Sequence, residues 1–150
     1  MMKHAKIGAV LFALWGLLHI VGGAAILLAA LESPDQGFAY YRAPDASYST
    51  LAGNVLAYLA FGFVWIGAVV SFVGIRYNFR NSYHGLMLNT ALVGFTDLGL
   101  LLFLVMPGHL GWLDAAPGLL LFVGAALFGG MACRSTLGTG TTNNRGHAHE

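Results

Sequence analysis

Apolar residues follow one another in four long runs along the chain, and short polar segments separate these runs. Each run has about the 20 residues that an α-helix needs to cross about 30 Å of hydrocarbon. The pattern therefore predicts four membrane-spanning helices, at residues 7–31, 51–75, 83–106 and 112–133.

The first run has a second interpretation, because Lys3 and Lys6 precede it as the charged region of a secretory signal peptide would. Its apolar stretch is longer than the roughly 7 to 15 residues of a signal peptide's core. The sequence Leu28-Ala29-Ala30 near its end is also a poor cleavage site. We therefore interpret the first run as a membrane helix.

The composition points to the same class of protein. Hydrophobic residues make up 57% of the 150 residues and charged residues only 9%, whereas about 25% of the residues in soluble domains are charged. A net charge of +1 with seven Lys and Arg residues cannot form the dense basic face of a nucleic-acid-binding protein. The lone Cys133 can form no internal disulfide. We expect an all-α integral membrane four-helix bundle that has the lipid bilayer as its surroundings and no nucleic acid as a partner.

The basic residues between the runs indicate the orientation of the bundle. With the exception of Arg42, they all fall on one side of the predicted helices: Lys3, Lys6, Arg76, Arg80, Arg134 and Arg145. Lys and Arg concentrate in cytoplasmic loops of membrane proteins. We therefore expect a multi-pass protein of the cell membrane with both termini cytoplasmic. Residues 1–134 would form the membrane domain, and the polar residues 135–150 a disordered cytoplasmic tail.

The predicted outer loop, residues 32–50, is long and rich in aromatic side chains, among them Phe38, Tyr40, Tyr41 and Tyr48. Aromatic rings with a polar tip favour the headgroup level, so this loop is expected to lie on the outer membrane surface. Loops of this length are also often functional. A lid or docking surface over the bundle is therefore the alternative.

Two ionisable residues lie inside the predicted helices, His19 in the first and Asp97 in the third. At about 1.5 Å per residue, His19 lies roughly 18 Å from residue 7, and Asp97 lies roughly 20 Å from residue 84. Both helices run outward, so the two side chains are expected at nearly one depth near the midplane. An unpaired charge there costs at least about 2.5 to 3.5 kcal/mol. We therefore predict a His19–Asp97 hydrogen bond in the bundle core.

Four further side chains are expected near this pair, because helical spacing puts them on the same stripe or on a neighbouring helix. Asn54 and Tyr58 lie one turn apart on the outer half of the second helix, where they would extend a polar patch toward the outer surface. Small residues such as Gly16, and the pair Gly67 and Ser71, indicate closely packed helices. The candidate polar core consists of Trp15, His19, Asn54, Tyr58, Thr90 and Asp97.

The sequence carries no sign of a cofactor, a metal site or catalysis. Haem with two axial histidines is not expected, because only His19 lies deep within a helix, while His84 and His109 lie near opposite ends of the third run. His147 and His149 in the tail make a poor metal site. The His-Glu-x-x-His, Gly-x-Ser-x-Gly and phosphate-binding-loop motifs are absent.

Two classes of function follow from this interpretation. The first is a small structural or accessory subunit of the membrane, whose polar pair locks helix packing, as part of a homo-oligomer or a larger complex. The alternative is a carrier or binding protein for a small molecule or lipid that uses the region of His19 and Asp97. Four helices make a thin transporter, so the alternative favours a dimer.

Overall fold

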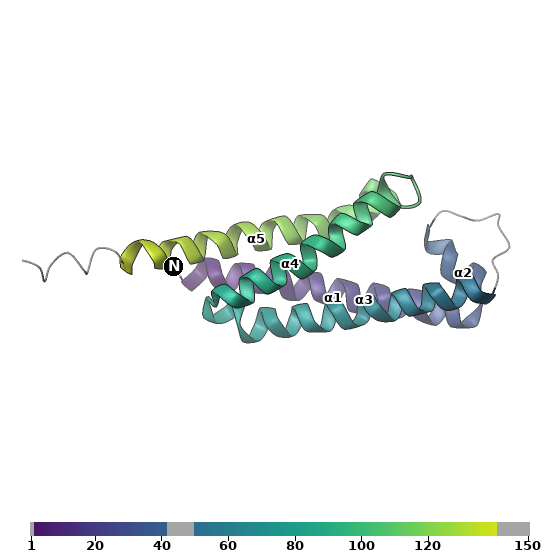
Figure 1. Ribbon diagram of the computed structural model, residues 1–150, viewed down its shortest axis with the longest axis horizontal. Helices are drawn as coiled ribbons and strands as arrows, with labels where there is room; N and C mark the ends of the chain where they lie inside the picture. The colour runs from purple at the N-terminus through teal and green to yellow at the C-terminus, as the bar shows by residue number, and fades with distance from the viewer. Residues whose placement is uncertain (1, 42–49, 141–150) are drawn as a thin grey trace, which may run out of the picture.

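The computed structural model describes residues 2–41 and 50–140 of the chain, and this part is helical throughout, without strands (Figure 1). Its long elements are α1 (Met2–Glu32), α3 (Thr50–Arg76), α4 (Tyr83–Leu100) and α5 (Trp112–Gly140). A π-helix, η3 (Leu101–Val105), continues α4. Within the described residues, four segments are long and apolar enough to span a membrane, which confirms the four predicted apolar helices.

Two of the long helices extend several residues beyond the predicted bounds, and α3 extends by one residue at each end. The helix α1 begins at Met2 rather than at residue 7, and α5 runs on to Gly140 instead of ending at residue 133. Residues 135–140, which were expected to be disordered, are therefore helical, and residues 141–150 lie outside the described part. An apolar run measures the thickness of hydrocarbon to be crossed, whereas a helix can continue into polar sequence.

The helices form two pairs that separate toward one end of the molecule. Helix α1 packs along α3 and also contacts α5, while α4 contacts both α3 and α5. Figure 1 shows α1 and α3 lying together, with α4 and α5 rising away from them toward the end that carries α2. A core of Phe12, Trp15, Val70, Val93 and Ala125 joins the four helices.

The closest contact between α1 and α3 depends on glycine. A Cβ atom built on Gly16 would clash with the Gly67 carbonyl oxygen and the Ser71 hydroxyl. The Ser71 hydroxyl donates a hydrogen bond across the same contact to the Ala13 carbonyl oxygen, at 3.3 Å. The predicted packing through small residues is thus found between two helices of the same chain.

The described part of the predicted outer loop folds onto the helices. It forms α2 (Pro34–Phe38) and η1 (Ala39–Tyr41). The Ser33 hydroxyl caps α2 by accepting a hydrogen bond from the Gln36 backbone N–H at 3.2 Å, and Pro34 occupies the first turn, where its missing N–H is not needed. Phe38 and Tyr41 pack against a second core of Ala30, Leu56 and Ala57.

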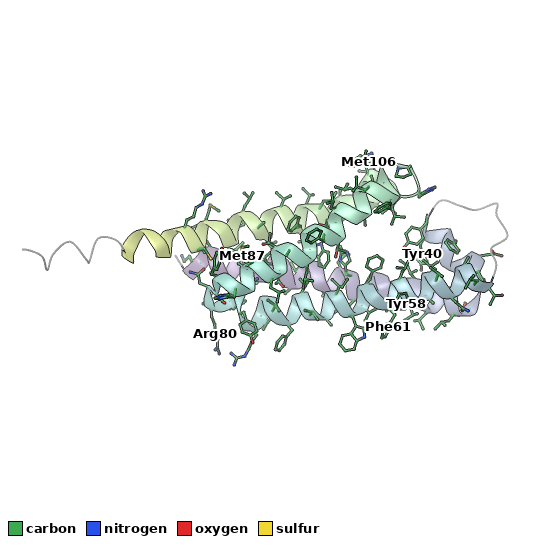
Figure 2. The ribbon with its side chains drawn as sticks, viewed as in Figure 1. Tyr40, Tyr58, Phe61, Arg80, Met87 and Met106 are labelled. Atoms are coloured by element: carbon green, nitrogen blue, oxygen red, sulfur yellow. The ribbon has the colours of Figure 1, made fainter. Side chains whose placement is uncertain are left out.

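The two ends of the molecule differ in charge. We call one the basic end, because it carries the exposed side chains of every Lys and Arg in the described part: Lys3, Lys6, Arg76, Arg80 and Arg134. The opposite end, with α2, η1 and the connection between η3 and α5, is called the α2 end. Figure 2 shows Arg80 at the basic end and Tyr40 and Met106 at the α2 end.

Candidate ligand-binding site

A cavity of about 220 Å³ lies where the two helix pairs separate. It is partly open, and its lining is mostly apolar. The four long helices, η1 and η3 all contribute to its walls, through Leu18, His19, Gly22, Gly23, Ile26, Tyr40, Tyr41, Phe63, Asp97, Leu100, Leu104, Leu110, Asp114, Ala115 and Gly118. Sequence elements that are far apart along the chain therefore meet around one space.

Asp97 is the buried polar group of this cavity. Its side chain is only 3% exposed. The Trp15 indole donates a hydrogen bond from Nε1 to Asp97 Oδ1 at 3.2 Å, whereas Asp97 Oδ2 is buried and has no hydrogen-bond partner. Buried polar atoms are hydrogen-bonded in the great majority of cases, so an unpartnered carboxylate oxygen in a cavity wall calls for an explanation.

The His19 ring is held by Trp15 rather than by Asp97. Its Nδ1 lies 2.9 Å from the Trp15 carbonyl oxygen, and the two rings stack with centroids 3.6 Å apart and planes 19° apart. A carbonyl oxygen can only accept, so His19 Nδ1 carries the proton in this contact. In the neutral imidazole, Nε2 is then a hydrogen-bond acceptor.

The predicted His19–Asp97 hydrogen bond is therefore wrong, although both residues line the same cavity. Depth along a helix gives the level of a side chain in the bundle but not its direction around the axis. At that level, the partner that reaches Asp97 is the Trp15 indole, one turn before His19 on α1. The His19 ring instead turns back to the carbonyl of its own helix four residues earlier.

Three other residues of the candidate polar core do not join the cavity. Tyr58 is 74% exposed and Asn54 is also exposed, so both lie on the outward face of α3. Thr90 is half-buried on α4, outside the cavity lining. The spacing correctly put Asn54 and Tyr58 on one face of the helix, but it did not show which way that face points.

The structure adds residues to the cavity that were not part of the predicted polar core. Tyr40 and Tyr41 from η1 line the cavity, and the aromatic composition of the predicted outer loop was the signal for them. Burial raises the pKa of the Tyr41 hydroxyl above its ordinary value. Phe63 and Asp114 also line the cavity and carried no comparable signal.

A second polar group is buried deeper between α3 and α4. Asn89 is fully buried and donates a hydrogen bond from Nδ2 to the Val70 carbonyl oxygen at 3.1 Å. It does not line the cavity. Asn89 therefore ties α4 to α3 and has a structural role.

The wall formed by α4 changes its helical form beside the cavity. In η3 the Met106 backbone N–H bonds to the Leu101 carbonyl oxygen at 2.9 Å, which is the i to i+5 pattern of a π-helix. Leu100 and Leu104, on either side of the start of this segment, both line the cavity. Single π-helical turns inside α-helices frequently occur at functional sites.

The described residues form no metal site, and no match to another protein identifies a function for the cavity. Across residues 2–41 and 50–140, no group of three or more His, Cys, Asp or Glu side chains is placed to hold a metal ion. Comparisons with protein-family models, curated proteins and solved structures find no match. The function must therefore be inferred from the cavity itself.

Proposed function

We propose that this chain is a membrane-embedded binding or carrier protein for a small, largely apolar molecule that brings at least one hydrogen-bond donor. In this proposal the four apolar helices cross the cell membrane, both termini are cytoplasmic, and the cavity lies in the outer half of the bilayer. The basic end would then face the cytoplasm, as the positive-inside rule favours.

The observation that carries the proposal is Asp97, which lines a mostly apolar cavity and whose buried Oδ2 has no hydrogen-bond partner. Ligand sites are typically concave and mostly apolar, with a few polar groups that fix the orientation of the ligand. Polar residues inside membrane segments are costly, and they mark functional sites by default. A donor from a ligand would satisfy Asp97 Oδ2 and remove that cost.

The volume of the cavity limits the size of the ligand that it can hold. An apolar cavity of about 150 Å³ holds benzene, so a cavity of about 220 Å³ accommodates one ring with a short substituent. The cavity is partly open, so part of a larger molecule can extend toward the surrounding lipid or the outer surface.

Native mass spectrometry of the protein released from mild detergent tests the proposal with a matched pair of variants. Gly22 lines the cavity and Gly62 does not, and a Cβ on either one meets nothing within 4 Å. Leucine at either position enters open space and improves helix propensity by about 1 kcal/mol, so both variants should fold. We expect a retained small molecule on the wild type and on Gly62→Leu that is lost from Gly22→Leu. If Gly22→Leu and Gly62→Leu retained the same small molecule, or if the wild type retained none, the result would contradict a ligand in this cavity.

A structural or accessory role is the second candidate, because two buried hydrogen bonds tie helices together, Trp15 to Asp97 and Asn89 to Val70. Such contacts pin helix packing without any ligand. In that case Asp97→Asn should lower the abundance of the protein or its association with partners. A binding protein should instead stay folded and lose its ligand.

A further inference from the structure

We propose that the ligand is a small lipophilic primary amine, bound as its ammonium ion with the nitrogen at Asp97 and the apolar part along the aromatic wall of the cavity. This inference rests on the proposed function and adds the chemical class of the ligand. Its basis is the balance of donors, acceptors and charges around the cavity.

Asp97 and His19, which line the cavity from α4 and α1, both offer hydrogen-bond acceptors. Asp97 Oδ2 has no donor, and His19 Nε2 accepts in the neutral ring because Nδ1 already donates to the Trp15 carbonyl oxygen. An ammonium group has three donors and no acceptor, so it matches this arrangement. An alcohol brings one donor, and a carboxylate would bring further acceptors.

The charges around the cavity favour a cation. Its two acidic residues are Asp97, deep in the wall, and Asp114, exposed in the first turn of α5. None of its lining residues is Lys or Arg, and all such residues between 2 and 41 and between 50 and 140 lie at the basic end. A buried carboxylate without a counter-charge is strongly unfavourable, and removing one partner of a buried pair is costly for the same reason. An ammonium ion of the ligand would supply the counter-charge that the described residues do not.

The remaining walls suit the apolar part of such a ligand. Three aromatic residues, Phe63, Tyr40 and Tyr41, line the cavity, and Figure 2 shows Tyr40 at the α2 end. The cavity of about 220 Å³ exceeds the roughly 150 Å³ that holds benzene by enough for a two-carbon amine substituent. An arylethylamine is therefore the size class that we expect.

Trp15 provides a reporter of binding, because its indole is hydrogen-bonded to Asp97. None of the three tryptophans lines the cavity, but Trp15 is fully buried beside Asp97, whereas Trp65 and Trp112 are exposed. A variant with Trp65→Phe and Trp112→Phe leaves Trp15 as the single tryptophan. Its fluorescence is titrated with three probes of similar size and different charge: 2-phenylethylamine, 2-phenylethanol and 3-phenylpropanoate.

We expect 2-phenylethylamine to bind at least about ten-fold more tightly than the alcohol, since hydrogen bonds between charged groups are roughly twice as strong as neutral ones. The carboxylate should bind most weakly. Asp97→Asn should weaken amine binding by about ten-fold or more and leave alcohol binding within about three-fold. Gly22→Leu should abolish binding of every probe, which separates the cavity from partition into detergent, while Gly62→Leu should bind like the parent.

Several results would overturn the amine while leaving the proposed function in place. One is alcohol or carboxylate binding that equals or exceeds amine binding and is abolished by Gly22→Leu. Another is carboxylate binding that depends on Arg42, which follows Tyr41 in the sequence and lies outside the described residues, as tested with Arg42→Gln. If Asp97→Asn fails to fold, the relative affinities of the parent protein for the three probes still test whether the site prefers an amine. No Gly22-dependent binding of any probe, together with no retained mass in native mass spectrometry, would overturn the proposed function itself.

Discussion

At the scale of single residues, the two carboxylate oxygens of Asp97 have different surroundings. One of its oxygens accepts the Trp15 indole N–H, which links α4 to α1, and the other has no partner. His19 lies against Trp15 by stacking and by its contact with the Trp15 carbonyl. Trp15 therefore contacts both His19 and Asp97 while remaining fully buried itself.

The Trp15–Asp97 hydrogen bond predicts a measurable coupling between these two residues. In a double-mutant cycle with Trp15→Phe and Asp97→Ala, we expect a coupling free energy of about 0.6 kcal/mol and at most about 1.7 kcal/mol, the average and the maximum found for hydrogen bonds between membrane helices. The measurement is reversible unfolding in mixed micelles. A parallel cycle with His19→Ala and Asp97→Ala should be closer to additive, because these side chains share no hydrogen bond in the described structure. A larger coupling for His19 than for Trp15 would contradict the observed arrangement.

Tyr41 predicts a loss of stability at high pH. Burial raises its pKa above the usual value of about 10, so folding favours the protonated hydroxyl. The contribution of this group to the free energy of unfolding is then complete below about pH 10 and is lost as the pH rises through the folded-state pKa. Unfolding measured from about pH 8 to 12 should show a decline that is smaller in Tyr41→Phe. Tyr58→Phe is the control, because Tyr58 is largely exposed, and an equal decline in both variants would refute the assignment.

At the scale of the elements, the number and place of the long helices follow from hydropathy, because only an apolar helix of sufficient length can cross hydrocarbon. The direction in which each helix turns its side chains does not follow in the same way. A helix that is apolar all around offers no contrast between an inward and an outward face. Asn54 and Tyr58 were therefore grouped with Asp97, although they are exposed.

Contacts between distant segments of the cavity lining could likewise be predicted only in part from the sequence. The sequence predicted that His19 and Asp97 lie at one level of the bundle, and both line the cavity. Tyr41 reaches it only because α2 and η1 fold back over the ends of α1 and α3, a contact between Phe38, Tyr41 and the core at Ala30. Aromatic content favoured a loop on the outer membrane surface and loop length offered a lid as the alternative, but no local pattern specifies where a loop packs.

The contact between α1 and α3 predicts that Gly16 cannot accept a side chain. Gly16→Val would push against the Gly67 backbone and the Ser71 hydroxyl, so α1 and α3 must move apart. We expect a loss of about 1 to 3 kcal/mol in the free energy of unfolding, as for overpacked cores. Gly62→Val on α3 is the matched control, because a Cβ there meets nothing within 4 Å and the helix propensities are the same. Equal stability of the two variants would mean that the helices do not approach closely at Gly16.

At the scale of the whole molecule, the cavity and the basic residues of the described part lie at opposite ends. The helix pairs are joined where the core of Phe12, Trp15 and Val93 is fully buried, and they part toward the α2 end, where the cavity lies. The Lys and Arg side chains of the described part are at the other end. In the proposed orientation, a ligand would therefore enter from the outer leaflet or the outer surface, away from the basic cytoplasmic end.

This orientation can be tested by labelling single cysteines in intact cells. In a Cys133→Ala background, Gln36→Cys places a thiol at the exposed α2 end and Tyr83→Cys places one at the exposed start of α4, at the basic end. Because Lys and Arg are retained on the cytoplasmic side, a membrane-impermeant maleimide should label Gln36→Cys in intact cells and Tyr83→Cys only after permeabilisation. The reverse pattern would place the cavity in the inner half of the membrane and turn its opening toward the cytoplasm. The cavity would keep its chemistry in that case, but its ligand would have to come from the cytoplasmic side, so the labelling result determines from which side each amine probe is offered in a transport assay.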